Sequence, residues 1–194
     1  MHSFLKSMLA SLGLVVALGS AYAIEVAGVK LDDTAKVAGK DLKLNGAGVR
    51  TKVFVKVYAA ALYLPEKKSS VAEILAMPGP RRVTLVMMRD VSAEDFGQSF
   101  VTGLNNNADK AEKTKIINQT AQFGEMFTLL PGIKKGDVLT LDWVPGSGTQ
   151  STLNGKKIGE IIPEQIFYNA VLKIWIGDNP ADSSLKPLLL GAKE

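Results

Sequence analysis

The sequence predicts an α+β fold, in which one large antiparallel sheet is covered on one side by a layer of helices. Strand-like and helix-like segments occur in blocks, without the strict β-α-β alternation of parallel sheets. Residues 53–64 form a long run of β-branched, alanine and aromatic residues that ends at Pro65, which is typical of a strand inside a sheet. The dipeptides Asn45-Gly46 and Asn154-Gly155 both favour tight hairpin turns between antiparallel strands.

The first strands are expected at 26–31 and 41–44, the second of which runs into the turn at Asn45-Gly46. Residues 53–64 are the expected partner after that turn. Alternating residues of a regular strand point to the same face. One face would therefore carry Arg50, Lys52, Phe54, Lys56, Tyr58, Ala60 and Leu62.

The middle of the chain predicts a short helix, a strand and then a pair of helices. Ser70 with Glu73 has the spacing of a capping box, and Pro78 and Pro80 end that helix before a strand at 82–88. A second helix begins near Ser92, and a third begins at Asp109. Apolar residues recur at helical spacing in both, so we expect the two helices to form a hairpin over the core.

The last third predicts an antiparallel meander followed by two helices. The strands are expected at 138–144, 149–153 and 156–161, with Asn154-Gly155 as the turn between the last two. Pro163 suits the first turn of a helix whose apolar face includes Phe167 and Ile174, and Gly177 suits a left-handed cap at its end. A short final helix is expected at 183–190.

The N-terminus predicts export. A lysine at position 6 precedes an apolar run at 8–18, and Ala21-Tyr22-Ala23 fits the small-x-small pattern of a cleavage site. The apolar run has about half of the roughly 20 residues needed to span a bilayer. We therefore predict a cleavable signal peptide at 1–23, a single domain at 24–194 without a transmembrane anchor, and a periplasmic or secreted protein.

Composition excludes several classes of chemistry. The chain has no cysteine, and its one histidine lies at position 2, inside the predicted signal. Residues 24–194 therefore cannot form a Ser-His or Cys-His nucleophile, a disulfide, or a metal site that uses thiolate or imidazole. No phosphate-binding glycine loop or calcium loop is present, so no cofactor and no metal is predicted. The net charge is only +4 and the basic residues are scattered, which argues against a nucleic-acid partner.

Three stretches resemble the chalcone isomerase-like proteins, particularly their exported bacterial branch. They read NGAGVRTK followed by FVKVYAAALYLP at 45–65, RDVSAE at 89–94, and AVLKIWIGDNP at 170–180. The resemblance implies an open-faced β-sandwich with a ligand cleft between the sheet and the helices.

The same resemblance identifies the candidate site. Arg50 matches the arginine that assists ring closure of a chalcone in the plant isomerases, whereas Tyr58 stands where those enzymes have a threonine, as in the fatty-acid-binding members. No tyrosine lies between Tyr63 and Tyr168, where the catalytic tyrosine would be expected. The isomerase set is therefore largely missing, and we assign no catalytic residue.

The remaining groups are better suited to holding a ligand than to transforming it. Arg50 and Tyr58 could grip a carboxylate through charge-assisted hydrogen bonds of about 1.5–3 kcal/mol each. An apolar cleft would gain about 0.8 kcal/mol for each methylene it buries. We therefore expect a non-catalytic binder of a fatty acid or similar apolar anion.

Other interpretations of the same residues stay open. Arg50 could pair with a nearby carboxylate, Tyr58 could lie at the sheet edge with its hydroxyl in water, and Phe167 and Trp175 are expected to pack in the core. An isomerase that uses Arg50 as an electrostatic catalyst is the alternative function. A structural or interaction module of the cell envelope is the third.

Overall fold

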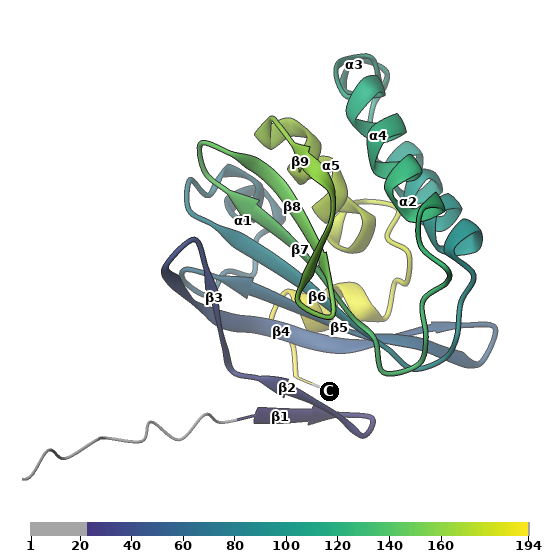
Figure 1. Cartoon of the computed structure of the whole chain (residues 1–194). Coiled ribbons are helices and arrows are strands. Elements are labelled where there is room, and N and C mark those ends of the chain that lie inside the picture. Colours follow the sequence, from purple (N-terminus) through teal and green to yellow (C-terminus); the bar gives the residue numbers. More distant parts are fainter. Residues whose placement is uncertain (1–22, 194) are drawn as a thin grey trace, which may run out of the picture.

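A seven-stranded antiparallel sheet with helices on one face dominates the computed structural model, which describes residues 23–193 (Figure 1). Every strand pairs with its neighbour in the chain, so the sheet is a continuous meander in the order β3 to β9. The strands are β3 (Thr34–Val37), β4 (Lys40–Lys52), β5 (Val55–Leu64), β6 (Arg81–Met87), β7 (Val138–Val144), β8 (Gly148–Leu153) and β9 (Lys156–Ile162). The predicted α+β architecture is confirmed.

A separate hairpin covers part of the sheet's other face. It consists of β1 (Ala23–Val26) and β2 (Val29–Asp32), joined by a turn at Ala27-Gly28. Leu31 from this hairpin packs with Leu42, Ala61 and Tyr63 of the sheet in a second apolar cluster. The single strand expected at 26–31 is therefore wrong, because the chain reverses within it. The predicted signal at 1–23 lies outside the described residues, except for Ala23, the first residue of β1.

The helices are α1 (Val71–Ala76), α2 (Ala93–Asn107), α3 (Lys110–Lys115), α4 (Ile117–Thr128), α5 (Gln165–Ile176) and α6 (Leu185–Leu189). Helices α1, α2, α4, α5 and α6 each bury apolar residues on the opposite face of the sheet, whereas α3 buries none. The predicted N-caps are confirmed: Ser70 and Ser92 accept hydrogen bonds from the backbone N–H groups of Glu73 and Asp95. The capping box expected at Ser70 is only half formed, because the Glu73 carboxylate accepts from the Lys68 ammonium at 3.1 Å. The helix expected from Asp109 is broken at Ile116 into α3 and α4.

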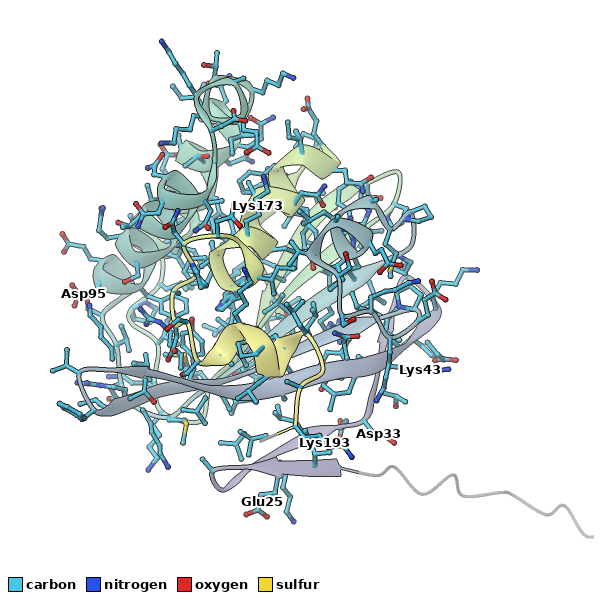
Figure 2. All side chains as sticks on the ribbon, turned by 180° about the vertical axis from the view of Figure 1, so that it is seen from behind. Glu25, Asp33, Lys43, Asp95, Lys173 and Lys193 are labelled. Carbon is cyan, nitrogen blue, oxygen red and sulfur yellow. The ribbon has the colours of Figure 1, made fainter. Side chains whose placement is uncertain are left out.

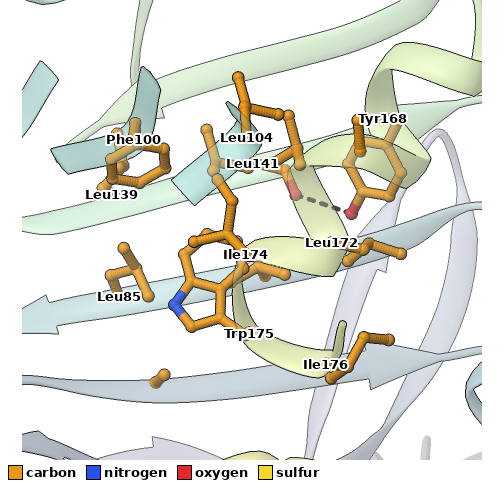
Figure 3. Packing of buried hydrophobic residues seen from close by; sticks show 14 of the residues in the cluster. Leu85, Phe100, Leu104, Leu139, Leu141, Tyr168, Leu172, Ile174, Trp175 and Ile176 are labelled. Atoms are coloured by element: carbon orange, nitrogen blue, oxygen red, sulfur yellow. Dashed lines mark hydrogen bonds between the residues drawn. The ribbon is translucent and has the colours of Figure 1, made fainter. Parts of the chain in front are cut away.

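The core between the helices and the sheet is built from large apolar side chains. Trp175 and Phe100 lie between α5, α2 and the strands, with Leu85 and Leu139 beneath them (Figure 3). Tyr168 is fully buried, and its hydroxyl donates to backbone carbonyls of the sheet, including that of Leu141 at 3.1 Å. Phe167 and Trp175 are core residues, as expected.

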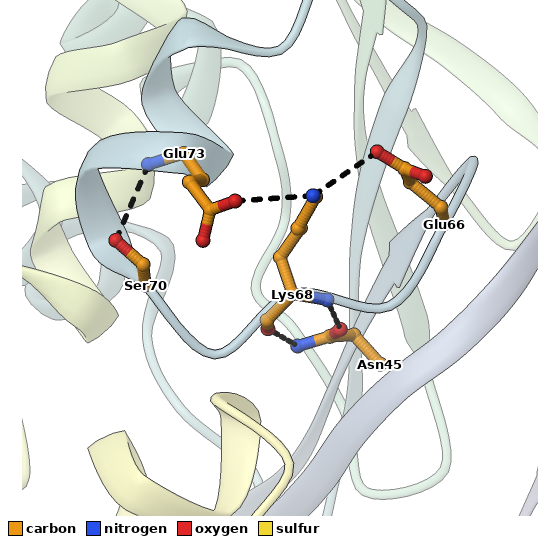
Figure 4. A network of polar contacts seen from close by, with 5 residues as sticks. All are labelled: Asn45, Glu66, Lys68, Ser70 and Glu73. Carbon is orange, nitrogen blue, oxygen red and sulfur yellow. Dashed lines mark hydrogen bonds and ion pairs between the residues drawn. The ribbon is translucent and has the colours of Figure 1, made fainter.

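The hairpin turn expected at Asn45-Gly46 is wrong. Strand β4 continues through these residues with a register shift, because both serve long-range packing. The Asn45 amide donates to the Lys68 carbonyl at 2.9 Å and accepts from the Lys68 N–H (Figure 4). It also donates to the Leu189 carbonyl at 2.7 Å. A side chain at Gly46 would collide with the backbone at the end of α6. The dipeptide therefore seats α6 on the strand.

The turn lies instead at Val53 and Phe54, which join β4 to β5. Both residues have positive φ angles, 47° and 65°. The hairpin at Asn154-Gly155 forms as predicted, with φ angles of 52° and 75°. Gly177 is not left-handed, since its φ is −74°; a side chain there would collide with Asn107 and with the carbonyl of Lys173.

Candidate functional site

Arg50 and Tyr58 are direct partners across the β4–β5 hairpin. Residues opposite each other in an antiparallel pair lie on the same face, and the Tyr58 side chain belongs to the core beneath the helices. The Arg50 guanidinium lies 5.6 Å from the centre of the Tyr58 ring, within the range of a cation–π contact. The sequence placed both residues on one face of one strand; the structure brings them together from two strands instead.

The Tyr58 hydroxyl is buried beneath this contact. The side chain is 4% exposed, and its oxygen accepts a hydrogen bond from the Trp175 indole N–H at 2.9 Å. Burial raises the pKa of Tyr58 to about 12, although the Arg50 charge and the Trp175 hydrogen bond act in the opposite direction. The phenol therefore keeps its proton at neutral pH, and this proton can be donated in a hydrogen bond.

The Arg50 guanidinium has no acidic partner among residues 23–193. The ion pairs of this part of the chain all involve other residues, and the buried Arg50 Nε has no hydrogen-bond partner there. Asp182 is close enough to influence Tyr58, but its carboxylate accepts from the Thr51 N–H at 2.8 Å and from Ser184. Burial alone would raise the pKa of Asp182, but these hydrogen bonds lower it overall. The interpretation of Arg50 as half of an ion pair is therefore wrong.

Arg50 lines a cleft of about 940 Å³ at the end of the β4–β5 hairpin. The walls come from the hairpin end, from residues 89–91 after β6, from α2, and from residues 179–181 after α5. Val55 and Val57 supply apolar surface next to Arg50, and Val91 and Pro180 supply more from the other walls. Tyr58 and Trp175 do not line the cleft; they lie behind Arg50.

The charge of the cleft favours an anion. Arg50, Lys52 and Arg89 line it together with Asp90 and Asp95. Asp90 already binds the Lys134 ammonium at 3.2 Å and the Lys135 N–H at 2.8 Å, and Asp95 accepts from the Ser92 hydroxyl at 2.7 Å. The hydrogen bonds from Lys135 and Lys134 lower the pKa of Asp90, so it stays ionised. Both carboxylates therefore already have hydrogen-bond partners, whereas Arg50 and Arg89 form no ion pair within residues 23–193.

Aromatic side chains fill the interior behind this cleft. Phe100 of α2 contacts Phe123, Phe127 and Trp175 with ring centres 5.3–5.6 Å apart. The cleft is therefore backed by a packed aromatic core at Phe100.

A sequence model of the chalcone isomerase-like family matches residues 23–191. The chain belongs to the chalcone isomerase-like family. The structure is similar to the crystal structure of a fatty-acid binding protein of Arabidopsis thaliana, with a TM-score of 0.71 and 14% sequence identity. The match covers 88% of this chain and 96% of the plant protein, so the two share their fold. No curated protein sequence matches.

A second hollow of this chalcone isomerase-like protein lies on the face of the sheet away from the helices. It measures about 650 Å³ and is lined by Tyr63 and Arg82, among others. Here the arginine is already occupied, because Asp142 binds it through two hydrogen bonds of 2.6 Å. Lys30 and Lys36 also line the hollow, but Asp32 and Asp41 line it with them and Lys36 pairs with Asp41 at 3.5 Å. The charges of this hollow are therefore balanced, and the Arg50 cleft is the better anion site.

Sequence reasoning missed two residues that support Arg50 and Tyr58 from outside the cleft lining. Trp175 was expected only to pack, yet it also orients the Tyr58 hydroxyl. Asp182 anchors the backbone directly after Arg50, and no local pattern marks it. Residues 23–193 contain no cluster of His, Cys, Asp or Glu suited to a metal ion, and none of their helices has the length and hydropathy to cross a bilayer.

Proposed function

We propose that this protein binds a fatty acid or similar apolar anion without transforming it, and that it does so outside the cytoplasm after cleavage behind Ala23. The observation that carries the proposal is the Arg50 guanidinium, which lines an open cleft and has no carboxylate partner in the described part of the chain. The fold shared with a fatty-acid binding protein supports the same ligand class.

Arg50 is the proposed anchor for the carboxylate. A guanidinium can hold a carboxylate through two parallel hydrogen bonds, each of about 1.5–3 kcal/mol. Val55, Val57 and Val91 would bury part of the tail at about 0.8 kcal/mol for each methylene. Because the core behind the cleft is filled by Phe100 and Trp175, we place the tail along these valines.

Tyr58 is the proposed second ligand-binding residue, and its ring also supports Arg50 from below. Its oxygen accepts from Trp175 and it lies behind Arg50, so its proton reaches a carboxylate only where the ligand displaces the guanidinium from the ring. With a pKa of about 12, the phenol is a hydrogen-bond donor and not a base at neutral pH. This favours binding over the isomerase alternative.

The test compares a charged ligand with a neutral one of equal length. Delipidated protein is titrated with dodecanoate and dodecanol by calorimetry, in the wild type and in Arg50→Gln. We expect Arg50→Gln to weaken dodecanoate binding by about tenfold to a hundredfold and to leave dodecanol binding unchanged. Arg89→Gln, which removes another cation of the cleft, is the matched control and should cost less than fivefold.

Tyr58→Phe separates the two roles of the tyrosine, because it keeps the ring under Arg50 and removes the hydroxyl. A loss of about tenfold in dodecanoate affinity indicates a direct hydrogen bond, and a loss below twofold indicates support alone. Absence of dodecanoate binding at high micromolar concentration, or wild-type affinity in Arg50→Gln, would refute the proposal.

Export is tested by mass spectrometry of the protein recovered from the periplasm. The measured mass should correspond to a chain that begins at Ile24.

A further inference from the structure

The end of the β4–β5 hairpin exposes three consecutive apolar residues. Val53 is 80% exposed, Phe54 is 99% exposed and Val55 is 42% exposed. The hairpin extends past the neighbouring strands and away from the body of the molecule (Figures 1 and 2). Other exposed large apolar residues, such as Ile117 and Leu129, lie in the helical layer and do not form such a run. We call residues 53–55 the apolar tip.

The fold does not benefit from these residues. Val53 and Phe54 belong to neither apolar cluster of the protein. Both also have positive φ angles, which Asn and Gly adopt easily but which crowd the side chain of a β-branched residue such as Val53. A turn selected for stability alone would resemble Asn154-Gly155 of this same chain. The apolar tip therefore has a role outside folding.

The strand residues on both sides of the apolar tip are basic. Lys52 and Lys56 flank it, both are exposed, and each pairs with a residue at the end of the hairpin. Arg50 lies two residues before Lys52 on the same strand. No Asp or Glu occurs between Lys43 and Leu64. An apolar projection with a collar of cations has the chemistry that binds the interface of an anionic lipid bilayer, where apolar side chains enter the acyl boundary and lysines meet the headgroups.

We propose that the apolar tip docks this protein onto an anionic lipid surface, with Val53 and Phe54 inserted and with Lys52 and Lys56 on the headgroups. Val53 and Val55 also line the Arg50 cleft. Docking therefore places the mouth of the cleft at the bilayer, where an amphipathic anion can pass along the valines to Arg50. This exchange step rests on the proposed function, whereas docking itself does not.

Vesicle flotation tests the docking. The chain is purified as its host processes it, its N-terminus is checked by mass spectrometry, and it is mixed with vesicles of phosphatidylglycerol and phosphatidylcholine or of phosphatidylcholine alone. We expect binding to the anionic vesicles that falls at least tenfold in Phe54→Ser and in Lys52→Gln/Lys56→Gln, and that weakens with added salt. Leu129→Ser, at an equally exposed leucine on the helical side, should change binding less than twofold.

Val53→Asn/Phe54→Gly is the decisive variant, because its turn is better suited to the backbone and a folding defect is not expected. We expect it to remain folded and to lose vesicle binding at least tenfold. The fluorescence of the new tryptophan in Phe54→Trp should be quenched by brominated lipid. The native Trp143 and Trp175 are buried, so their fluorescence should change little. Arg50→Gln should keep at least half of the vesicle binding, which separates docking from ligand capture.

Three outcomes would overturn the inference. The first is wild-type vesicle binding in Val53→Asn/Phe54→Gly, and the second is equal binding to neutral and anionic vesicles. The third is a tip that crosslinks to a protein while the chain binds neither kind of vesicle.

Discussion

Replacing the β4–β5 turn by the residues its backbone requires should stabilise the protein. The perturbation is Val53→Asn/Phe54→Gly, which copies the Asn154-Gly155 turn of the β8–β9 hairpin. The two turns have similar φ angles, 47° and 65° against 52° and 75°. Only the side chains differ, so the change isolates the conformational cost of Val53 and Phe54.

The size of the effect follows from the backbone and from exposure. A left-handed conformation costs an L-residue about 1–2 kcal/mol, so two such residues together cost about 2–4 kcal/mol. The replacement loses little burial because both side chains are largely exposed. The new glycine gives the unfolded chain more conformations, which reduces this stabilisation by about 0.5–1 kcal/mol. The net stabilisation is about 1–3 kcal/mol, or roughly 2 to 10 °C in Tm for a chain of this size.

Urea unfolding followed by circular dichroism, together with a thermal melt, measures the change. The reverse exchange, Asn154→Val/Gly155→Phe, is the matched control and should destabilise by about 2 kcal/mol or more. It also removes the hydrogen bond that the Asn154 side chain accepts from the Val138 N–H. An unchanged or lower unfolding midpoint in the Val53→Asn/Phe54→Gly protein would refute the reasoning, because it would mean that the turn is not strained.

Two further predictions concern the buried phenols and the packing of α6. Burial raises the pKa of Tyr58 and of Tyr63 from 10 to about 12, so stability is fully present below pH 10 and falls as the pH rises through 12, by about 2–3 kcal/mol for Tyr58. Urea unfolding midpoints at pH 8 to 12 measure this loss of stability, which should be smaller in Tyr58→Phe. Phenolate absorbance of the folded protein that is complete near pH 10 would contradict the raised pKa values. Gly46→Ala should cost about 2 kcal/mol or more in urea unfolding, because its Cβ would meet the carbonyls at the end of α6. Gly124→Ala, whose Cβ would lie 3.3 Å from one methyl group of Val101 and meet no backbone atom, should cost less than about 1 kcal/mol. Equal effects of the two alanines would contradict the packing of α6.

Elements fixed by local chemistry could be predicted from the sequence. The caps at Ser70 and Ser92 depend on groups within three residues, and the Asn154-Gly155 turn depends on two residues with low-cost positive φ angles. For the caps and this turn, the stabilising partners lie close in the chain, so the local pattern was sufficient. The sheet covered by helices was predicted from the order of strand-like and helix-like blocks along the chain.

The Asn45-Gly46 prediction failed because the partners lie far away. The same dipeptide makes a turn at 154–155 and continues a strand at 45–46, since the Asn45 amide binds the Leu189 carbonyl 144 residues later. Val53 and Phe54 carry no turn signal at all. They become the turn because β4 continues through 45–46 and pairs with β5 as far as Lys52 and Val55.

The candidate site was predicted in part. Arg50 and Tyr58 were identified together through a family resemblance, and the structure places them in contact, but across a hairpin that the sequence put elsewhere. The Trp175 hydrogen bond and the Asp182 anchor join segments more than 100 residues apart, which no local pattern encodes. The ligand-binding role of Arg50 and Tyr58 stays a prediction.

The resonance of the Arg50 side chain tests the central claim most directly. Arginine Nε–H signals are recorded by NMR while dodecanoate is added, with dodecanol as the uncharged comparison and Arg50→Gln to assign the signal. We predict that the Arg50 signal shifts in step with dodecanoate binding, because its guanidinium gains a carboxylate partner, and that dodecanol leaves it in place. Saturation by dodecanoate with an unmoved Arg50 signal would contradict the account.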